Sequence, residues 1–211
     1  HETGEFLLPW VYLHAIKDYT DMAYHLEKYS KVKAVINFVP ILLEQLEDYS
    51  DQFSQGTPRD PLLRLLITPD LDSISIEDRM LILNQCFQSN HNTMLKPYPT
   101  YQHLRDLYEV LMGYGDKEMS YVSGQYLADL LTWYHLAWTG ESVRRNCELV
   151  GKLMQQGKSF TYSDRRQLFE LIGMLIRDLI PRYRKLAVSG QIELSTTPHY
   201  HPLSPLLIDF N

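Results

Sequence analysis

The feature that most constrains the fold is a nearly continuous apolar run between Lys31 and Phe38. A strand that is apolar on both faces is typical of a parallel sheet covered by helices on both sides, as in an α/β barrel. Pro40 follows and suits the first turn of a helix, so the segment predicts a strand followed by a helix. Such barrels carry their chemistry at the C-terminal strand ends. Asn37 is therefore a candidate binding residue there, although the sequence slightly favours a buried amide that holds the loop.

A second extended segment occupies residues 191–197, where apolar and polar side chains alternate with the period of a strand. Pro198 and Pro202 end it, because proline cannot donate a hydrogen bond to a strand ladder. The strand carries one carboxylate, and the stiffened loop after it carries two histidines and a tyrosine. Such a polar loop suits a binding or catalytic rim. The candidate residues of this segment are Glu193, His199 and His201.

Helical patterns fill the stretch between the two strands, about residues 60–189. The longest covers Ser163–Ser189, and Pro181 is expected to kink or split it. Ser120–Trp138 is apolar over a wide arc and is expected to be buried. Glu141–Gln156 is expected to form one further helix. The order is strand, helix, helical insertion, strand, and two clear strands are too few to close a barrel.

Composition excludes some classes of partner. The 211 residues carry a formal net charge of −6, which argues against nucleic acid and anionic membranes as partners. No apolar run approaches the ~18 residues that a membrane-spanning helix needs. Cys86 and Cys147 are far apart, without the spacing of a disulfide framework. A reducing compartment fits better, and we expect a cytoplasmic location.

Four motifs, spread over most of the chain, carry a resemblance to a known family. They are LPWVYLHAIKDY (8–19), NFVPILLEQL (37–46), LTWYHLAW (131–138) and GQIELSTTPHYHP (190–202). In this order they resemble glycoside hydrolase family 57, the retaining α-glucan-active enzymes that include α-amylases, amylopullulanases and 4-α-glucanotransferases. The last motif is similar to the family's second conserved region, extended as in the amylase and amylopullulanase branch. Tyr12 departs from the pattern, because many members have arginine at that position.

The resemblance implies a fold class of α/β, as part of an incomplete parallel (β/α)7 barrel. Residues 1–211 would be the N-terminal portion of one catalytic domain, with its helical insertion at about 60–189. It also implies retaining hydrolysis or transfer on α-1,4-glucan of the amylase or amylopullulanase type, with an α-glucan or maltooligosaccharide as partner and no cofactor.

Retaining hydrolysis needs two carboxyl groups about 5 Å apart. In the family both catalytic carboxylates lie downstream of the motif at Gly190. Neither is therefore assigned to a residue here, and the chain alone is expected to be inactive. Glu193, which its strand position alone would nominate for catalysis, is instead expected to line the site or to accept a structural hydrogen bond. The residues expected to bind substrate are Trp10, His14, Asn37, Glu193, His199 and His201.

Several alternatives remain at these positions. His14 can bind a sugar hydroxyl or be satisfied in the interior, and Trp133 or Trp138 can face sugar, although packing is favoured for both. No metal is predicted. A site of His199 and His201 with Glu193 or Asp209 is the less favoured interpretation, because residues at i and i+2 of an extended segment point the same way. It would fit a rival, a metal-dependent polysaccharide deacetylase-like barrel. The other rival is a non-catalytic helical interaction module.

Overall fold

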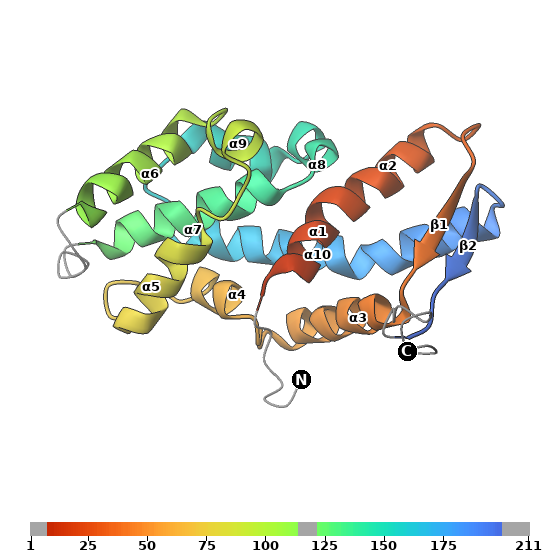
Figure 1. Ribbon diagram of the computed structural model, residues 1–211, viewed down its shortest axis with the longest axis horizontal. Coiled ribbons are helices and arrows are strands. Elements are labelled where there is room, and N and C mark those ends of the chain that lie inside the picture. Colours follow the sequence, from red (N-terminus) through yellow and green to blue (C-terminus); the bar gives the residue numbers. More distant parts are fainter. Residues whose placement is uncertain (1–7, 114–121, 200–211) are drawn as a thin grey trace, which may run out of the picture.

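The computed structural model describes residues 8–113 and 122–199. The elements are α1 Trp10–His14, the π-helix η1 Ala15–Tyr19, α2 Thr20–Lys28, β1 Ala34–Phe38, α3 Pro40–Gln55, α4 Pro61–Leu66, α5 Ile76–Gln85, the π-helix η2 His91–Leu95, α6 Pro99–Met112, α7 Gly124–Trp138, α8 Glu141–Asn146, α9 Glu148–Gln156, α10 Tyr162–Val188 and β2 Ile192–Thr196. The described chain is thus mostly helical, with two strands. Helices α4 to α9 gather around one end of the molecule, and the strands lie at the other end (Figure 1).

The two strands pair in parallel, with Phe38 opposite Thr196. Both predicted strands are confirmed, with shorter ends. Helix α10 covers one face of the pair, where the Phe38 and Tyr183 ring centroids lie 5.2 Å apart and Ile192 is buried. On the other face Val35 is 65% exposed. The prediction that the first strand is buried on both faces is therefore wrong for the described residues, because only one side of the sheet is covered.

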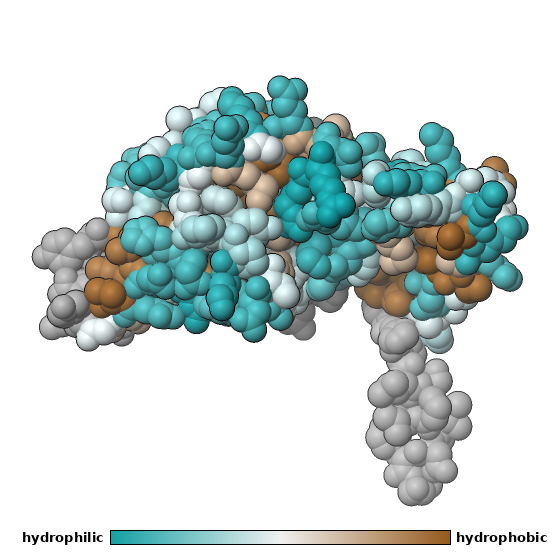
Figure 2. All heavy atoms as spheres, turned by 90° about the horizontal axis from the view of Figure 1, so that it is seen from above, coloured by the Kyte–Doolittle hydropathy of each residue, from teal (hydrophilic) through white to brown (hydrophobic). Residues whose placement is uncertain are grey.

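Hydrophobic side chains remain on the surface near the sheet. Figure 2 shows brown atoms at the end of the molecule where Figure 1 places β1 and β2. Tyr29 and Val32, in the connection from α2 to β1, and Leu194 on β2 are each more than half exposed. Within the described residues the sheet has two strands and does not close into a barrel.

Helix α10 is the longest element and the one on which most others pack. Thr161 and Asp164 form a reciprocal capping box at its start. It contacts α2, α3, α4, α9 and β2 and runs along the long axis of the molecule (Figure 1). A kink or a split is expected at Pro181, and the split does not occur. The helix continues to Val188, because Tyr183 and Leu186 are buried and hold the last turns against the core.

Helix α7 forms the core of the helical end. Every residue from Leu127 to Trp138 is buried, as its wide apolar arc predicts. The helix begins at Gly124 instead of Ser120, because the Ser123 hydroxyl accepts a hydrogen bond from the Tyr126 N–H and caps it. No helix of the described residues is both long and apolar enough to cross a membrane.

Residues 141–156 form two helices where one is expected. Cys147 has an extended backbone, with φ −102° and ψ 113°, and caps both α8 and α9. An extended residue interrupts the hydrogen bonds between residues four apart that an α-helix requires. Both Cys86 and Cys147 are free, and Cys86 is buried as a small hydrophobic residue.

The contact between α10 and α3 depends on Gly173. A Cβ at this position would lie 2.7 Å from Cδ1 of Phe53, whose ring packs on Phe169 with centroids 4.6 Å apart. We expect Gly173→Ala to lower the free energy of unfolding by about 1–2 kcal/mol, because overpacking outweighs the gain in helix propensity. The control Gly151→Ala lies in α9 with nothing within 4 Å and should be stabilising. Urea unfolding measures both, and stabilisation by both would contradict the prediction.

Candidate functional site

Two predicted binding residues share the open face of the sheet. Because side chains alternate along a strand and the register pairs Val35 with Glu193 and Asn37 with Ser195, these four lie on the face away from α10. Asn37 is exposed, and its Oδ1 accepts a hydrogen bond of 3.1 Å from the Ser195 hydroxyl. The slightly favoured interpretation of Asn37 as a buried amide is therefore wrong, because no helix covers this face in the described chain.

Glu193 projects from the same face of the sheet. Its side chain is exposed and has no hydrogen-bond or ion-pair partner within residues 8–113 and 122–199. It does not act as a structural acceptor for the described strands. Of the ten residues that form β1 and β2, Glu193 is the one with a carboxylate. Glu193 lies opposite Val35, two residues before Asn37 on the neighbouring strand. Its unpaired carboxylate can accept hydrogen bonds from ligand hydroxyls beside the exposed Asn37 amide.

His199 lies just beyond the C-terminal end of β2. Its Nε2 lies 2.6 Å from Oε1 of Glu44, and its carbonyl accepts a hydrogen bond from the Ile41 N–H at the start of α3. Sequence reasoning missed Glu44. The order of strand and helix in the sequence could have identified Glu44. A helix that follows a strand directly has its first turns beside the C-terminal ends of the strands.

His201 and Asp209 lie outside the described residues. No three His, Cys, Asp or Glu side chains of the described part are placed to hold a metal ion. The less favoured metal site of His199 and His201 with Glu193 or Asp209 stays untested, because His201 and Asp209 are not among the described residues.

Trp10 and His14 belong to a different surface, built from helices. The Trp138 ring centroid of α7 lies 5.8 Å from Trp10 and 5.5 Å from His14, and Trp138 is 6% exposed. His14 also faces Tyr19 at 6.4 Å. Trp133, the other tryptophan considered for sugar contact, is buried, and its indole N–H donates to the Gly157 carbonyl. Both tryptophans of α7 are therefore buried, and Trp138 packs behind the rings of Trp10 and His14.

A charged pair that the sequence did not reveal completes this group. Asp18 Oδ2 lies 2.5 Å from His14 Nδ1, and Asp18 Oδ1 accepts a 2.5 Å hydrogen bond from the Lys17 ammonium. Desolvation raises the pKa of the Asp18 carboxyl, but the hydrogen bonds from Lys17 and His14 outweigh it and leave the pKa below its ordinary value. Asp18 is therefore ionised at neutral pH.

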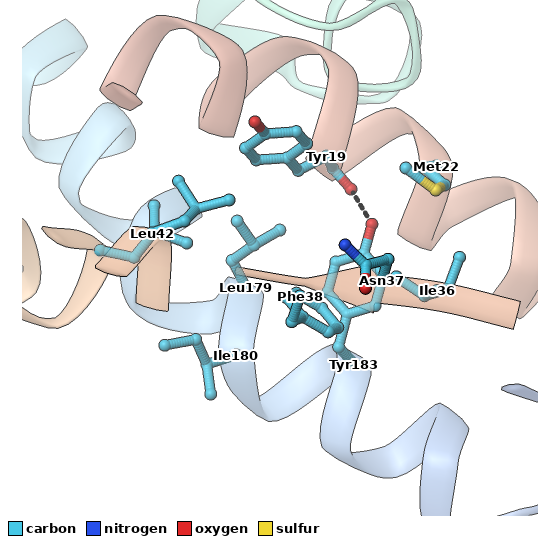
Figure 3. A pocket seen from close by; sticks show the side chains of 10 residues that line it. Tyr19, Met22, Ile36, Asn37, Phe38, Leu42, Leu179, Ile180 and Tyr183 are labelled. Atoms are coloured by element: carbon cyan, nitrogen blue, oxygen red, sulfur yellow. Dashed lines mark hydrogen bonds between the residues drawn. The ribbon is translucent and has the colours of Figure 1, made fainter. Parts of the chain in front are cut away.

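Tyr19 links the helical surface to the sheet. It lines a cavity of about 60 Å³ together with Asn37 and Phe38, and the Tyr183 hydroxyl donates a 2.9 Å hydrogen bond to its carbonyl (Figure 3). The other lining residues are mostly apolar and come from α2, α3, β1 and α10. A space that holds a few water molecules is too small for a sugar ring, so this cavity is a packing void beneath the site.

Tyr12, at the position where the resemblance leads one to expect arginine, is a core residue. Its hydroxyl lies 3.0 Å from His135 Nε2, and His135 Nδ1 lies 2.7 Å from the Leu131 carbonyl. Because that carbonyl only accepts, Nδ1 carries the proton and Nε2 accepts from Tyr12. Burial lowers the pKa of His135 to about 4, so the imidazole stays neutral. At the position where the family pattern has arginine, this chain therefore has a hydrogen bond between two neutral side chains, Tyr12 and His135.

Comparison with known proteins gives one match. The family model described as Glycosyl hydrolase family 57 matches residues 1–210. Neither the curated proteins nor the solved structures contain a significant match to the chain.

Proposed function

The chain belongs to glycosyl hydrolase family 57, and from this membership we propose that it binds α-1,4-linked glucan as the substrate of an amylase or amylopullulanase type of reaction. The substrate class follows from the family at the level of glycans. The single observation that carries the proposal here is the open sheet face with Asn37 and Glu193. Both side chains are exposed and both can exchange hydrogen bonds with sugar hydroxyls.

The sheet supports a particular architecture for this site. Parallel sheets are ordinarily covered on both faces, and within the described residues helices cover one face only. We propose that β1, α3 and β2 are strand and helix units of an incomplete (β/α)7 barrel, with the open face turned toward its interior. Residues of about 60–189 would then be a helical insertion between two strands of one domain. Barrel enzymes carry binding groups at the C-terminal strand ends, which is where His199 and Glu44 meet.

The reaction needs more than the strands supply. A retaining mechanism requires a nucleophile and an acid/base about 5 Å apart. Because β1 and β2 provide the single carboxylate of Glu193, we assign substrate binding to Glu193. We propose that the nucleophile and the acid/base come from residues outside these strands.

Isothermal titration with maltoheptaose tests the proposal. We expect saturable binding by the protein, and we expect Glu193→Gln to weaken it roughly fivefold, since one hydrogen bond to a charged acceptor is worth about 1 kcal/mol or more. Glu47→Gln is the matched control, because Glu47 is also exposed but lies on α3. Failure to bind any α-glucan would overturn the proposal.

Two other outcomes of the same study point to the rival functions. Stoichiometric transition metal in the purified protein would favour a deacetylase-like enzyme. No sugar binding, together with capture of a specific protein partner, would favour a helical interaction module.

A further inference from the structure

Three polar side chains cluster where α1 continues into the π-helical turn η1. His14 is the last residue of α1, and Lys17 and Asp18 belong to η1. The Asp18 carboxylate lies between the imidazole of His14 and the ammonium of Lys17, with both distances 2.5 Å. The side chains of His14, Lys17 and Asp18 are 42%, 30% and 41% exposed, so solvent reaches all three. The cluster is therefore an open polar site, distinct from the buried hydrogen bonds of the core.

The hydrogen bonds determine which atom of His14 meets a ligand. Asp18 is ionised, and an ionised carboxylate only accepts hydrogen bonds. The short contact therefore requires a proton on His14 Nδ1, and in the tautomer that carries its proton there the lone pair lies at Nε2. No described residue donates to Nε2. A ligand hydroxyl can do so.

Aromatic rings surround this acceptor. Trp10 lies 6.4 Å from His14 between ring centroids, Trp138 meets His14 edge to face at 5.5 Å, and Tyr19 lies on a further side at 6.4 Å. The Lys17 ammonium is 6.0 Å from the Trp138 ring centroid. Aromatic faces next to hydroxyl acceptors and a cation match a sugar, which presents C–H surfaces and hydroxyl groups side by side.

The turn that carries the cluster is held from several sides. The Gly140 N–H donates to the Ile16 carbonyl at 3.0 Å, and the Thr20 hydroxyl donates to the Ala15 carbonyl at 2.7 Å. The Tyr183 hydroxyl holds the Tyr19 carbonyl. A Cβ at Gly140 would lie 2.6 Å from Asp21 Oδ1, so the close approach of α8 requires glycine. Isolated π-turns often mark functional positions, and this one is rigid.

We propose that the junction of α1 and η1 forms a sugar-binding subsite in which His14 Nε2 accepts a hydrogen bond from a glucan hydroxyl. Asp18 is the positioning residue that fixes the imidazole, and Lys17 balances the charge of Asp18. This rests on the proposed function, because the ligand class is the α-glucan named above. It adds Asp18, Lys17 and Tyr19 to the residues that serve the substrate, while the buried Trp138 supports the His14 ring from behind.

Asp18→Asn tests the positioning role. The asparagine oxygen still accepts from Lys17, and its amide N–H then faces His14 Nδ1, which moves the imidazole proton to Nε2. A sugar hydroxyl can accept as well as donate, so we expect maltoheptaose binding to weaken roughly fivefold and not to vanish. ¹⁵N NMR of the histidine side chains reads the tautomer directly, in the presence and absence of the sugar.

Two further variants make the result decisive. His14→Phe keeps a ring against Trp138 but removes both nitrogens, and we expect roughly tenfold weaker binding. Asp51→Asn removes an exposed carboxylate on α3 and should leave both the tautomer and the affinity unchanged. If wild-type protein binds maltoheptaose and Asp18→Asn binds it equally well, the subsite is overturned and the proposed function stands. If the wild-type protein binds no glucan, the subsite and the proposed function both fail. The His14 tautomer in Asp18→Asn then still tests whether Asp18 fixes the imidazole.

Discussion

Replacing Arg165 with alanine is expected to lower the free energy of unfolding by at least about 3 kcal/mol, because hydrogen bonds to a charged donor contribute about 1.5–3 kcal/mol each and buried unpaired acceptors are costly. Arg165 is 2% exposed. Its guanidinium donates to the carbonyls of Leu65, Leu66, Thr68 and Pro69, which end helix α4 and begin the loop after it. Removing it leaves these carbonyls inside the protein without that donor.

The adjacent residue provides the control. Arg166 pairs with Glu170 on the surface, where both side chains are more than half exposed, so Arg166→Ala should change stability by less than about 1 kcal/mol. Arg165→Lys should fall between the two, since an ammonium has three donors but lacks the planar fork. Chemical denaturation at pH 7 measures all three. Equal midpoints for Arg165→Ala and Arg166→Ala would show that the buried network adds nothing.

The second large effect is a dependence of stability on pH that originates at Asp60. This residue is 1% exposed and caps α4, accepting hydrogen bonds from the N–H groups of Leu62 and Leu63 and from the Tyr49 hydroxyl. Desolvation is the largest influence and raises its pKa from 3.8 to about 6, although the hydrogen bonds act in the opposite direction.

The sign follows from which state holds the proton more tightly. Between about pH 4 and pH 6 the folded protein keeps the Asp60 proton while the unfolded chain releases it. Tighter proton binding by the folded protein stabilises the folded state. This contribution is fully present below the Asp60 pKa of the unfolded chain, and it is lost as the pH rises through the Asp60 pKa of the folded protein. A shift of about two pKa units corresponds to about 3 kcal/mol. We therefore expect Asp60 to reduce stability by up to that amount between pH 4 and pH 6.5.

Asp60→Asn isolates this contribution, because asparagine keeps an acceptor for the cap but does not ionise. The difference in unfolding free energy, wild type minus variant, should fall by about 3 kcal/mol from pH 4 to pH 6.5. Asp51→Asn, at an exposed site on α3, should give a constant difference. A constant difference for Asp60→Asn as well would mean that the Asp60 pKa is the same in both states.

The sequence predicted the secondary structure well where one local signal dominated. A continuous apolar run located the first strand, and period-two alternation located the second. The wide apolar arc of 120–138 predicted a buried helix. It failed where distant packing decided. Pro181 does not split α10, since Tyr183 and Leu186 anchor the turns beyond it. Cys147 separates α8 from α9, and no glycine or proline at this point of the sequence predicts the break.

The candidate site divides in the same way. The sequence named Asn37 and Glu193 as separate candidates on two strands. Only the parallel register of β1 and β2 shows that the two side chains share one face of the sheet. The structure places Trp10 and His14 in a helical cluster instead, with Trp138 from more than a hundred residues away. The tertiary structure also brings Glu44 to His199, which lies at the other end of the chain.

The sequence by itself determined the family, the two strands and the helical nature of the stretch between them, because motifs, alternation and turn residues act over a few neighbours. The tertiary structure alone decided which faces are covered, which charges meet and which carbonyls Arg165 satisfies. Those depend on contacts such as Trp138 with His14 and Arg165 with a loop some hundred residues earlier. Burial and hydrogen bonding across such separations are properties of the packed chain, and no local pattern encodes them.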